Sequence, residues 1–287
     1  MLYLIAASLI WSLSFGVVGN LLAGLPPAWL ATARLAIAAA VFLPFARRVP
    51  ARTGAALMGI GAVQFGCMSL AYMSSFRYLK SHEVALFTVM TPVYVAVFND
   101  LLGRKFHGAN LLAALLAVGG AGVILWKGVS SEAPLLGFLL VEASNLCFAS
   151  GQLAYRELLG RMAQPPADRQ AMFWLYLGGL AAVGPLGLRD AFASAPHPTF
   201  LQLAALLYLG AVVSGVSYFC WNSGARRVSG GVLAVMNNLK IPLGVAASFL
   251  LFGERASVPG LLAGAVLIGA ALIPVLRPTS GKPPPQP

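Results

Sequence analysis

Two polar groups inside one apolar stretch of this 287-residue chain suit the binding of an anion. Lys240 lies near the middle of residues 229–252, and Asn237 shares its helix face three residues earlier. An ionised lysine at the centre of a bilayer costs roughly 3 kcal/mol, so it must face protein, water or a solute. We expect Lys240 and Asn237 to bind a carboxylate. The alternatives are a structural partner for Glu142 and a side chain that reaches an interface.

Glu142 is the acid placed deepest within an apolar stretch, and it heads a polar stripe. Asn145 and Gln152 follow at +3 and +10, within about 80° of it on a helix that turns ~100° per residue. The functional hypothesis is a proton carrier, or a ligand for the amine of a solute, with Asn145 beside it. The alternative is a polar contact between packed helices. Lys240 and Glu142 are also candidates to pair in the empty protein.

Aromatic side chains form a looser set of binding candidates. We select Trp11, Tyr72, Tyr94 and Trp221 as residues that could line a cavity, from a wider aromatic set that also contains Tyr155, Trp174 and Tyr218. Packing or an interfacial belt is the alternative for each. Trp11 and Trp221 are favoured, because serines share their helix faces. Arg34, by contrast, is expected to reach an interface or to cap a neighbouring helix.

The motifs of common enzyme classes do not occur. His82-Glu83 begins like a zinc motif, but Leu86 stands where the second histidine would be. The Walker A loop, the GxSxG nucleophile motif and metal-binding cysteine pairs are also missing. We therefore expect no enzyme activity, no cofactor and no metal.

The composition predicts that these residues lie on membrane-spanning helices. Hydrophobic residues make up 59% of the chain and charged residues 9%, against about 25% charged in soluble domains. A helix needs ~20 apolar residues to cross a bilayer. Ten stretches qualify: about 2–22, 27–46, 54–76, 83–102, 107–126, 134–156, 170–188, 200–222, 229–252 and 257–276.

The chain also resembles itself at a spacing of 150 residues. Thr91–Val123 aligns with Ile241–Ile273 without a gap, and Pro92 falls on Pro242. We infer two homologous halves of five helices, residues 1–127 and 134–276, followed by a disordered tail, 277–287. Because five is odd, the second half must be inverted. The predicted fold is all-α and polytopic, with ten transmembrane helices in two inverted repeats.

The net charge of +11 follows this topology, so no nucleic-acid partner is needed. With Met1 in the cytoplasm, 12 Lys and Arg residues fall on the cytoplasmic side and 5 on the other, while Arg34 and Lys240 lie within spans. The excess fits the positive-inside rule. We expect a multi-pass protein of the bacterial inner membrane with both termini cytoplasmic. The sequence fixes no oligomeric state, and a monomer is compatible with it.

Several of these features resemble the EamA-type transporters of the drug/metabolite transporter superfamily. They are the ten spans, the early Trp11, Arg34 in span two, and Pro242 followed by Gly253-Glu254 at the end of span nine. The resemblance covers almost the whole chain, although Arg104 stands where the first half of the family usually has Glu. It implies export or exchange of small metabolites, and many members resemble amino-acid exporters.

We therefore expect a secondary transporter for a small organic metabolite, such as an amino acid, that works by alternating access across the bilayer. The alternatives are a lipid flippase and an intramembrane enzyme. Polar stripes on spans one, three, four, six, eight and nine predict that these spans line a central cavity.

Overall fold

The computed structural model describes residues 2–103, 134–228, 236, 240, 244, 247–253, 266 and 270, and within them it contains helices and no strands. Its α-helices are α1 (Leu2–Gly16), α2 (Pro27–Phe42), α3 (Ala51–Gly61), α4 (Met68–Ser75), α5 (Ser81–Phe87), α6 (Thr91–Gly103), α8 (Pro134–Gly160), α9 (Asp168–Ser194), α10 (Phe200–Leu207) and α11 (Tyr218–Ala225). Shorter π-helical or 3-10 segments continue or join them: η1 (Val17–Leu21), η2 (Leu43–Phe45), η3 (Ala62–Cys67), η4 (Thr88–Met90) and η5 (Tyr208–Ser217).

Six described helices are long and apolar enough to cross a membrane, and they coincide with six predicted spans. They are Leu2–Leu21, Pro27–Phe45, Ala51–Ser75, Leu135–Gly160, Asp168–Ser194 and Phe200–Ala225. The predicted span 83–102 falls on α5, η4 and α6. Span 107–126 lies outside the described residues, span 229–252 is described at 236, 240, 244 and 247–252, and span 257–276 at 266 and 270. The all-helical membrane fold is confirmed, while the count of ten and the repeat stay predictions.

Local sequence signals set several helix boundaries. A capping box opens α10, where the Thr199 hydroxyl accepts from Gln202 N and the Gln202 side chain accepts from Thr199 N. Glu83 acts in the same way on α5, because its carboxylate accepts from Lys80 N at 2.8 Å. The turn before α2 uses Gly24 at φ 87°, a conformation that glycine adopts without strain.

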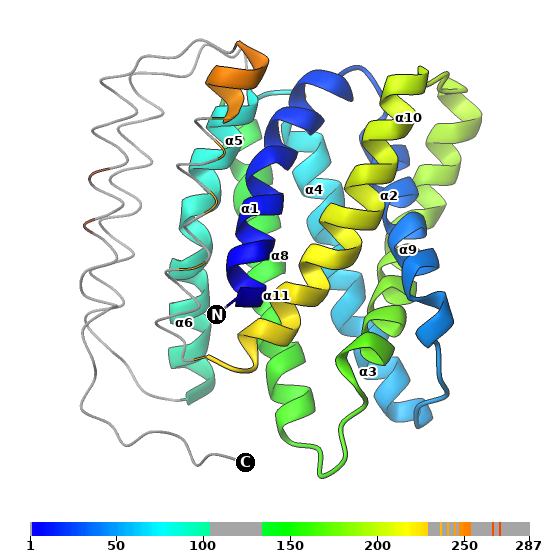
Figure 1. Ribbon diagram of the computed structural model, residues 1–287, viewed down its shortest axis with the longest axis vertical. Helices are drawn as coiled ribbons and strands as arrows, with labels where there is room; N and C mark the ends of the chain where they lie inside the picture. Colours follow the sequence, from blue (N-terminus) through cyan, green and yellow to red (C-terminus); the bar gives the residue numbers. More distant parts are fainter. Residues whose placement is uncertain are drawn as a thin grey trace.

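The described helices form an upright bundle (Figure 1), in which α1, α2 and the helix Ala51–Ser75 alternate in direction, as do α8, α9 and the helix Phe200–Ala225. Tyr3, at the start of α1, contacts Arg227 after α11, and the neighbouring Arg226 pairs with Asp168 at the start of α9. We call this end of the bundle, at the bottom of Figure 1, the arginine end. At the opposite end, Asn20 of η1 donates to Ser81 of α5. Because α8 ends at the arginine end, where α1 begins, the two helices run in opposite directions.

Small residues allow α3 and α9 to pack with their backbones in contact. A side chain at Gly61 would meet the Leu175 backbone, and one at Gly178 would meet the Met58 backbone. Such close approach at small residues is typical of helix pairs in membranes, where packing replaces the hydrophobic effect as the driving force. This contact fixes α9 beside α3, and α2 packs along α9 as well.

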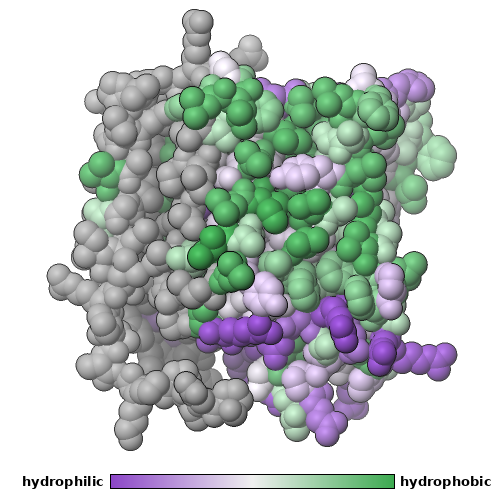
Figure 2. Space-filling model, in the orientation of Figure 1, coloured by the Kyte–Doolittle hydropathy of each residue, from purple (hydrophilic) through white to green (hydrophobic). Residues whose placement is uncertain are grey.

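The outer surface fits a lipid environment. Large apolar side chains are exposed along α1, α8 and α10, among them Leu2, Leu9, Leu139 and Leu207. Figure 2 shows hydrophobic residues over most of the visible described face and hydrophilic ones gathered toward the arginine end. A wide apolar band with a charged rim is what a bilayer requires of an embedded protein.

Candidate functional site

A small cavity lies inside the helix bundle, with a volume of about 60 Å³. That volume holds a few water molecules, at ~15 Å³ each. All six spans expected to line a cavity contribute to it, and span two adds Arg34. The lining residues are Trp11, Ser14, Phe15, Arg34, Met68, Tyr72, Thr88, Thr91, Ser144, Asn145, Phe148, Val213, Tyr218 and Lys240.

Lys240 reaches this cavity as a buried cation, 7% exposed. Its Nζ lies 5.0 Å from the centroid of the Trp11 ring and 5.9 Å from that of Phe148. Cation–π contacts of this kind are worth roughly 2 kcal/mol when desolvated. They offset part of the cost of holding an ammonium group away from water.

Arg34 corrects the sequence prediction, because it does not reach an interface. The residue is 3% exposed and lines the cavity, and its Nη2 donates to the Ser214 hydroxyl at 3.0 Å. Its Nη1 lies 3.7 Å from the sulfur of Met73. The reason lies in the surroundings of α2, which is packed against α9, η5 and α4. This face of α2 is turned into the protein, so the guanidinium has no route to water along the lipid boundary.

The charge on the described cavity wall is positive. Arg34 and Lys240 line it from different helices, and no acidic side chain is among the described residues that line it. Because charges interact more strongly where the dielectric constant is low, two cations in this site attract an anion and repel a cation. The sequence alone could not show that Arg34 and Lys240 line the same cavity, because they lie 206 residues apart.

Glu142 lies directly behind this wall rather than on it. Asn145 Nδ2 donates to its Oε2 at 3.2 Å, and the Tyr94 hydroxyl donates to the same oxygen at 2.8 Å. Asn145 is itself held by the Thr91 hydroxyl and by the carbonyl of Phe87, both at 3.0 Å. Among the described residues, Oε1 of Glu142 has no hydrogen-bond partner. Asn145 therefore separates the carboxylate from the cavity.

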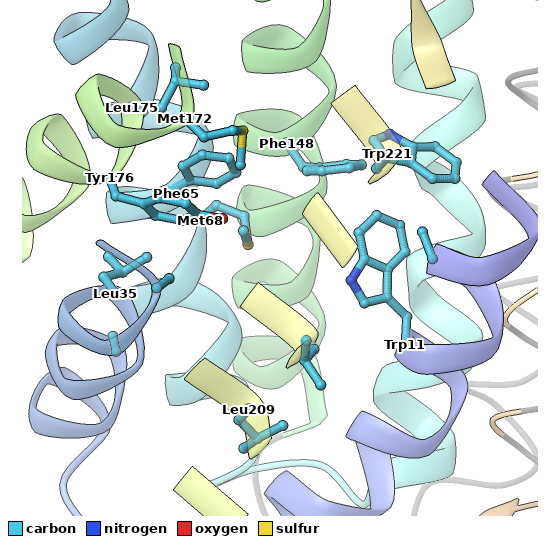
Figure 3. Packing of buried hydrophobic residues seen from close by; sticks show 14 of the residues in the cluster. Trp11, Leu35, Phe65, Met68, Phe148, Met172, Leu175, Tyr176, Leu209 and Trp221 are labelled. Atoms are coloured by element: carbon cyan, nitrogen blue, oxygen red, sulfur yellow. The ribbon is translucent and has the colours of Figure 1, made fainter. Parts of the chain in front are cut away.

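The two predicted tryptophans lie against each other. The ring centroids of Trp11 and Trp221 are 4.9 Å apart, and Phe148 lies beside them (Figure 3). Tyr218 completes the cluster, with its ring centroid 5.1 Å from that of Trp11. Trp221 is fully buried, and its Nε1 donates to Gln152 at 2.8 Å. Trp11 lines the cavity, whereas Trp221 supports it from the side of the arginine end.

Among the remaining predicted residues, some line the cavity and others lie behind its wall. Tyr72 lines the cavity, Tyr94 is linked to the lining residue Asn145 through Glu142, and Asn237 lies outside the described residues. Tyr218, from the wider aromatic set, and Phe148, which sequence reasoning did not name, line the cavity beside Trp11. Aromatic residues are common in every span, so no local signal separated these two from packing residues.

Known proteins that are similar to this chain in sequence are named as transporters. Over 275 residues the chain is 38% identical to a probable biotin transporter of Pseudomonas aeruginosa, covering 95% of this chain and 96% of that protein. It is 36% identical to a biotin transporter of Escherichia coli over 277 residues, which cover 95% of this chain and 91% of that protein. It is 24% identical to a probable amino-acid metabolite efflux pump of the same species over 283 residues, which cover 92% of this chain and 88% of that protein. A solved protein crystal structure covers 96% of this chain and is itself covered to 95%, with a TM-score of 0.69 and 19% identity.

The match to a family extends over both halves of the sequence. The model of the EamA-like transporter family matches residues 1–126 and 135–276. Together with the helical membrane fold and the relatives named as transporters, this match excludes the intramembrane enzyme among the earlier alternatives and supports a small-molecule transporter. The chain belongs to the EamA-like transporter family.

Proposed function

We propose that this protein carries a small carboxylate-bearing metabolite across the bacterial inner membrane by alternating access, and that biotin is the first candidate. The observation that carries the proposal is the pair of buried cations, Arg34 and Lys240, on the described wall of one cavity. A carboxylate between them would supply the negative charge that the described wall lacks. The relatives named as biotin transporters supply the candidate.

The same charge argument separates biotin from an amino acid. Biotin has a carboxylate on an aliphatic chain and an uncharged fused ring system, so it enters as an anion. An α-amino acid also carries an ammonium group, which needs an acidic partner in a low-dielectric site. Glu142 does not line the described wall, and its carboxylate accepts from the lining residue Asn145. The cavity therefore favours an anion over a zwitterion, and the amino-acid exporter becomes the second candidate.

Helix directions support two inverted halves. An exchange of residues 1–127 with 134–276 would relate α1 to α8, α2 to α9, and the helix Ala51–Ser75 to the helix Phe200–Ala225. The two members of each pair run in opposite directions (Figure 1). Their packing follows the same exchange: α4 packs on α8 as α11 packs on α1, and η3 packs on α9 as η5 packs on α2.

One of these pairs also matches in sequence and in helix geometry. Gly61-Ala62-Val63 and Gly66 correspond to Gly210-Ala211-Val212 and Gly215 at a spacing of 149 residues. Both helices contain a π-helical segment there, η3 and η5. Such segments interrupt the regular hydrogen-bond pattern and occur often at functional sites. Matched irregular segments beside the cavity would let the two halves move in equivalent ways.

The cavity must widen during transport. A volume of about 60 Å³ is far below the ~300 Å³ at which small-molecule sites begin. We therefore assign this structure to a compact state of the cycle, with the solute admitted when the two halves rock apart. In the proposed cycle Asn237 adds a polar group near Lys240, and Glu142 takes up and releases a proton by way of the Tyr94 hydroxyl, which donates to its Oε2.

Counterflow in proteoliposomes tests the proposal. Purified protein is reconstituted with a high internal concentration of unlabelled solute, and entry of the labelled solute is followed for biotin, phenylalanine and leucine. We expect labelled biotin to accumulate transiently and the amino acids to stay at the level of empty vesicles. If only the amino acids accumulated, an amino acid would replace biotin as the first candidate substrate. Scrambling of labelled phospholipid without solute exchange would instead support the flippase.

A further inference from the structure

A second pocket opens at the arginine end of the bundle, with a volume of about 370 Å³. It is formed by the start of α1, the loop between α8 and α9, the start of α9 and the end of α11. None of its described lining residues lines the central cavity. The pocket is therefore a separate site, and its chemistry can be considered on its own.

The lining carries an excess of positive charge. Arg169, Arg226 and Arg227 face one acid, Asp168, which gives a net charge of +2. Arg226 donates to Asp168 at 2.5 Å, so this pair is internally neutral. Arg227 lies 5.2 Å from the centroid of the Tyr3 ring, and Arg169 lies 5.6 Å from that of Phe45.

Within the described part of the chain, no carboxylate lies at ion-pair distance from Arg169 or Arg227. These two guanidinium groups keep their hydrogen-bond donors for another acceptor. Arginine presents those donors in a planar fork that matches the oxygens of a phosphate group.

A buried hydroxyl on the same wall also lacks a partner. Ser223 of α11 is 2% exposed and lines the pocket, and its Oγ has no hydrogen bond to any described residue. A buried polar group left unpaired costs about 1–3 kcal/mol. An oxygen acceptor bound in the pocket would remove that cost, so the hydroxyl and the two arginines point to the same kind of ligand.

Apolar side chains flank this pocket, and some of them are exposed on the surface of the protein. Phe219 forms one wall and packs on Phe42 with ring centroids 5.9 Å apart, while Phe45 beyond it is 39% exposed. Leu2, next to Tyr3, is 80% exposed. A ligand here would have its charged group among arginines and its apolar part against these side chains.

We propose that this pocket binds the headgroup phosphate of an acidic phospholipid. Basic pockets between transmembrane helices are a recognised form of lipid headgroup site. Free phosphate offers the same oxygens but cannot use the apolar flank, which is why the lipid is the occupant that we choose.

Native mass spectrometry of the full-length protein in detergent tests this assignment. Dioleoyl phosphatidylglycerol and dioleoyl phosphatidylcholine are titrated separately. We expect one phosphatidylglycerol to bind at least about fivefold more tightly, since one cation near an anionic headgroup changes affinity by about that factor. Arg227→Gln should lose about fivefold of this affinity, Arg227→Lys should restore most of it, and Ser223→Ala should weaken binding.

The matched control is Arg189→Gln, which removes one exposed arginine from α9 near its other end and should leave the affinity unchanged. Equal affinities for the two lipids would overturn the proposal, as would an equal loss in Arg189→Gln. Displacement of the lipid by inorganic phosphate at the same concentration would assign the pocket to a free anion. Displacement by biotin would make it a vestibule for the solute. Either result would also overturn the lipid assignment.

Discussion

At the scale of single residues, function depends on how two buried cations are held. Lys240 relies on the faces of Trp11 and Phe148, whereas Arg34 relies on the hydroxyl of Ser214 and the sulfur of Met73. A bound carboxylate would add hydrogen bonds to charged groups, which are worth ~1.5–3 kcal/mol each.

Replacement of either cation by methionine should abolish most transport. Methionine roughly keeps the side-chain volume and removes the charge, so we expect Lys240→Met and Arg34→Met each to lower biotin counterflow by ~10- to 100-fold with folding retained. The exposed residues Lys80 and Arg189 provide matched controls, and their methionine variants should transport normally. Flux near the wild-type level in both cavity variants would show that the site lies elsewhere.

Glu142 should affect coupling more than binding, because Asn145 stands between it and the cavity. In Glu142→Gln we expect counterflow to persist and the stimulation of net uptake by an imposed pH gradient to disappear. Tyr94→Phe removes one donor to the same carboxylate and serves as a milder comparison. Loss of counterflow together with a lower melting temperature in Glu142→Gln would make this residue a structural one.

At the scale of helices, the contact between α3 and α9 positions the cavity wall. Gly61→Ala should lower stability by about 1–3 kcal/mol, because its new methyl group meets the Leu175 backbone, which cannot rotate away. Gly59, two residues earlier on α3, has no atom within 4 Å of such a methyl group. Gly59→Ala should therefore be neutral or stabilise the helix by up to ~1 kcal/mol.

Thermal unfolding in detergent, followed by circular dichroism, measures both glycine variants. Equal melting temperatures for Gly61→Ala and Gly59→Ala would contradict the close packing of α3 on α9.

Helix positions were predictable from the sequence, whereas side-chain neighbours were not. Length and apolar composition located the six described spans, because a bilayer imposes both. The polar stripe of Glu142 and Asn145 followed from helical periodicity, and the two side chains do meet. Arg34 was missed because its burial depends on α9 and η5, which belong to the other half of the chain. Which of the many aromatic residues face the cavity depends on the same long-range packing.

At the scale of the whole molecule, charge sets the orientation in the membrane. Arg226 and Arg227 lie at the arginine end with Arg169, and the loop that carries Arg47 packs there too, because its carbonyl accepts from Trp174 of α9. The positive-inside rule predicts that this end faces the cytoplasm.

Thiol labelling of intact cells tests this orientation. In a background without the native cysteines, a membrane-impermeant reagent should modify Ser194→Cys, at the far end of α9, and spare Arg161→Cys, in the loop before α9. Both positions are exposed, so access to solvent alone cannot explain a difference. The reverse pattern would invert the predicted topology.

The most direct test of anion selection compares biotin with biotinamide, which has the same shape without the charge. Each compound is titrated as an unlabelled competitor against labelled biotin in proteoliposome counterflow. If Arg34 and Lys240 bind the carboxylate, the concentration of biotinamide that gives half-inhibition should be ~10- to 100-fold higher than that of biotin. This ratio corresponds to the loss of one hydrogen bond to a charged group. Equal inhibition by the two compounds would contradict a carboxylate held by these cations.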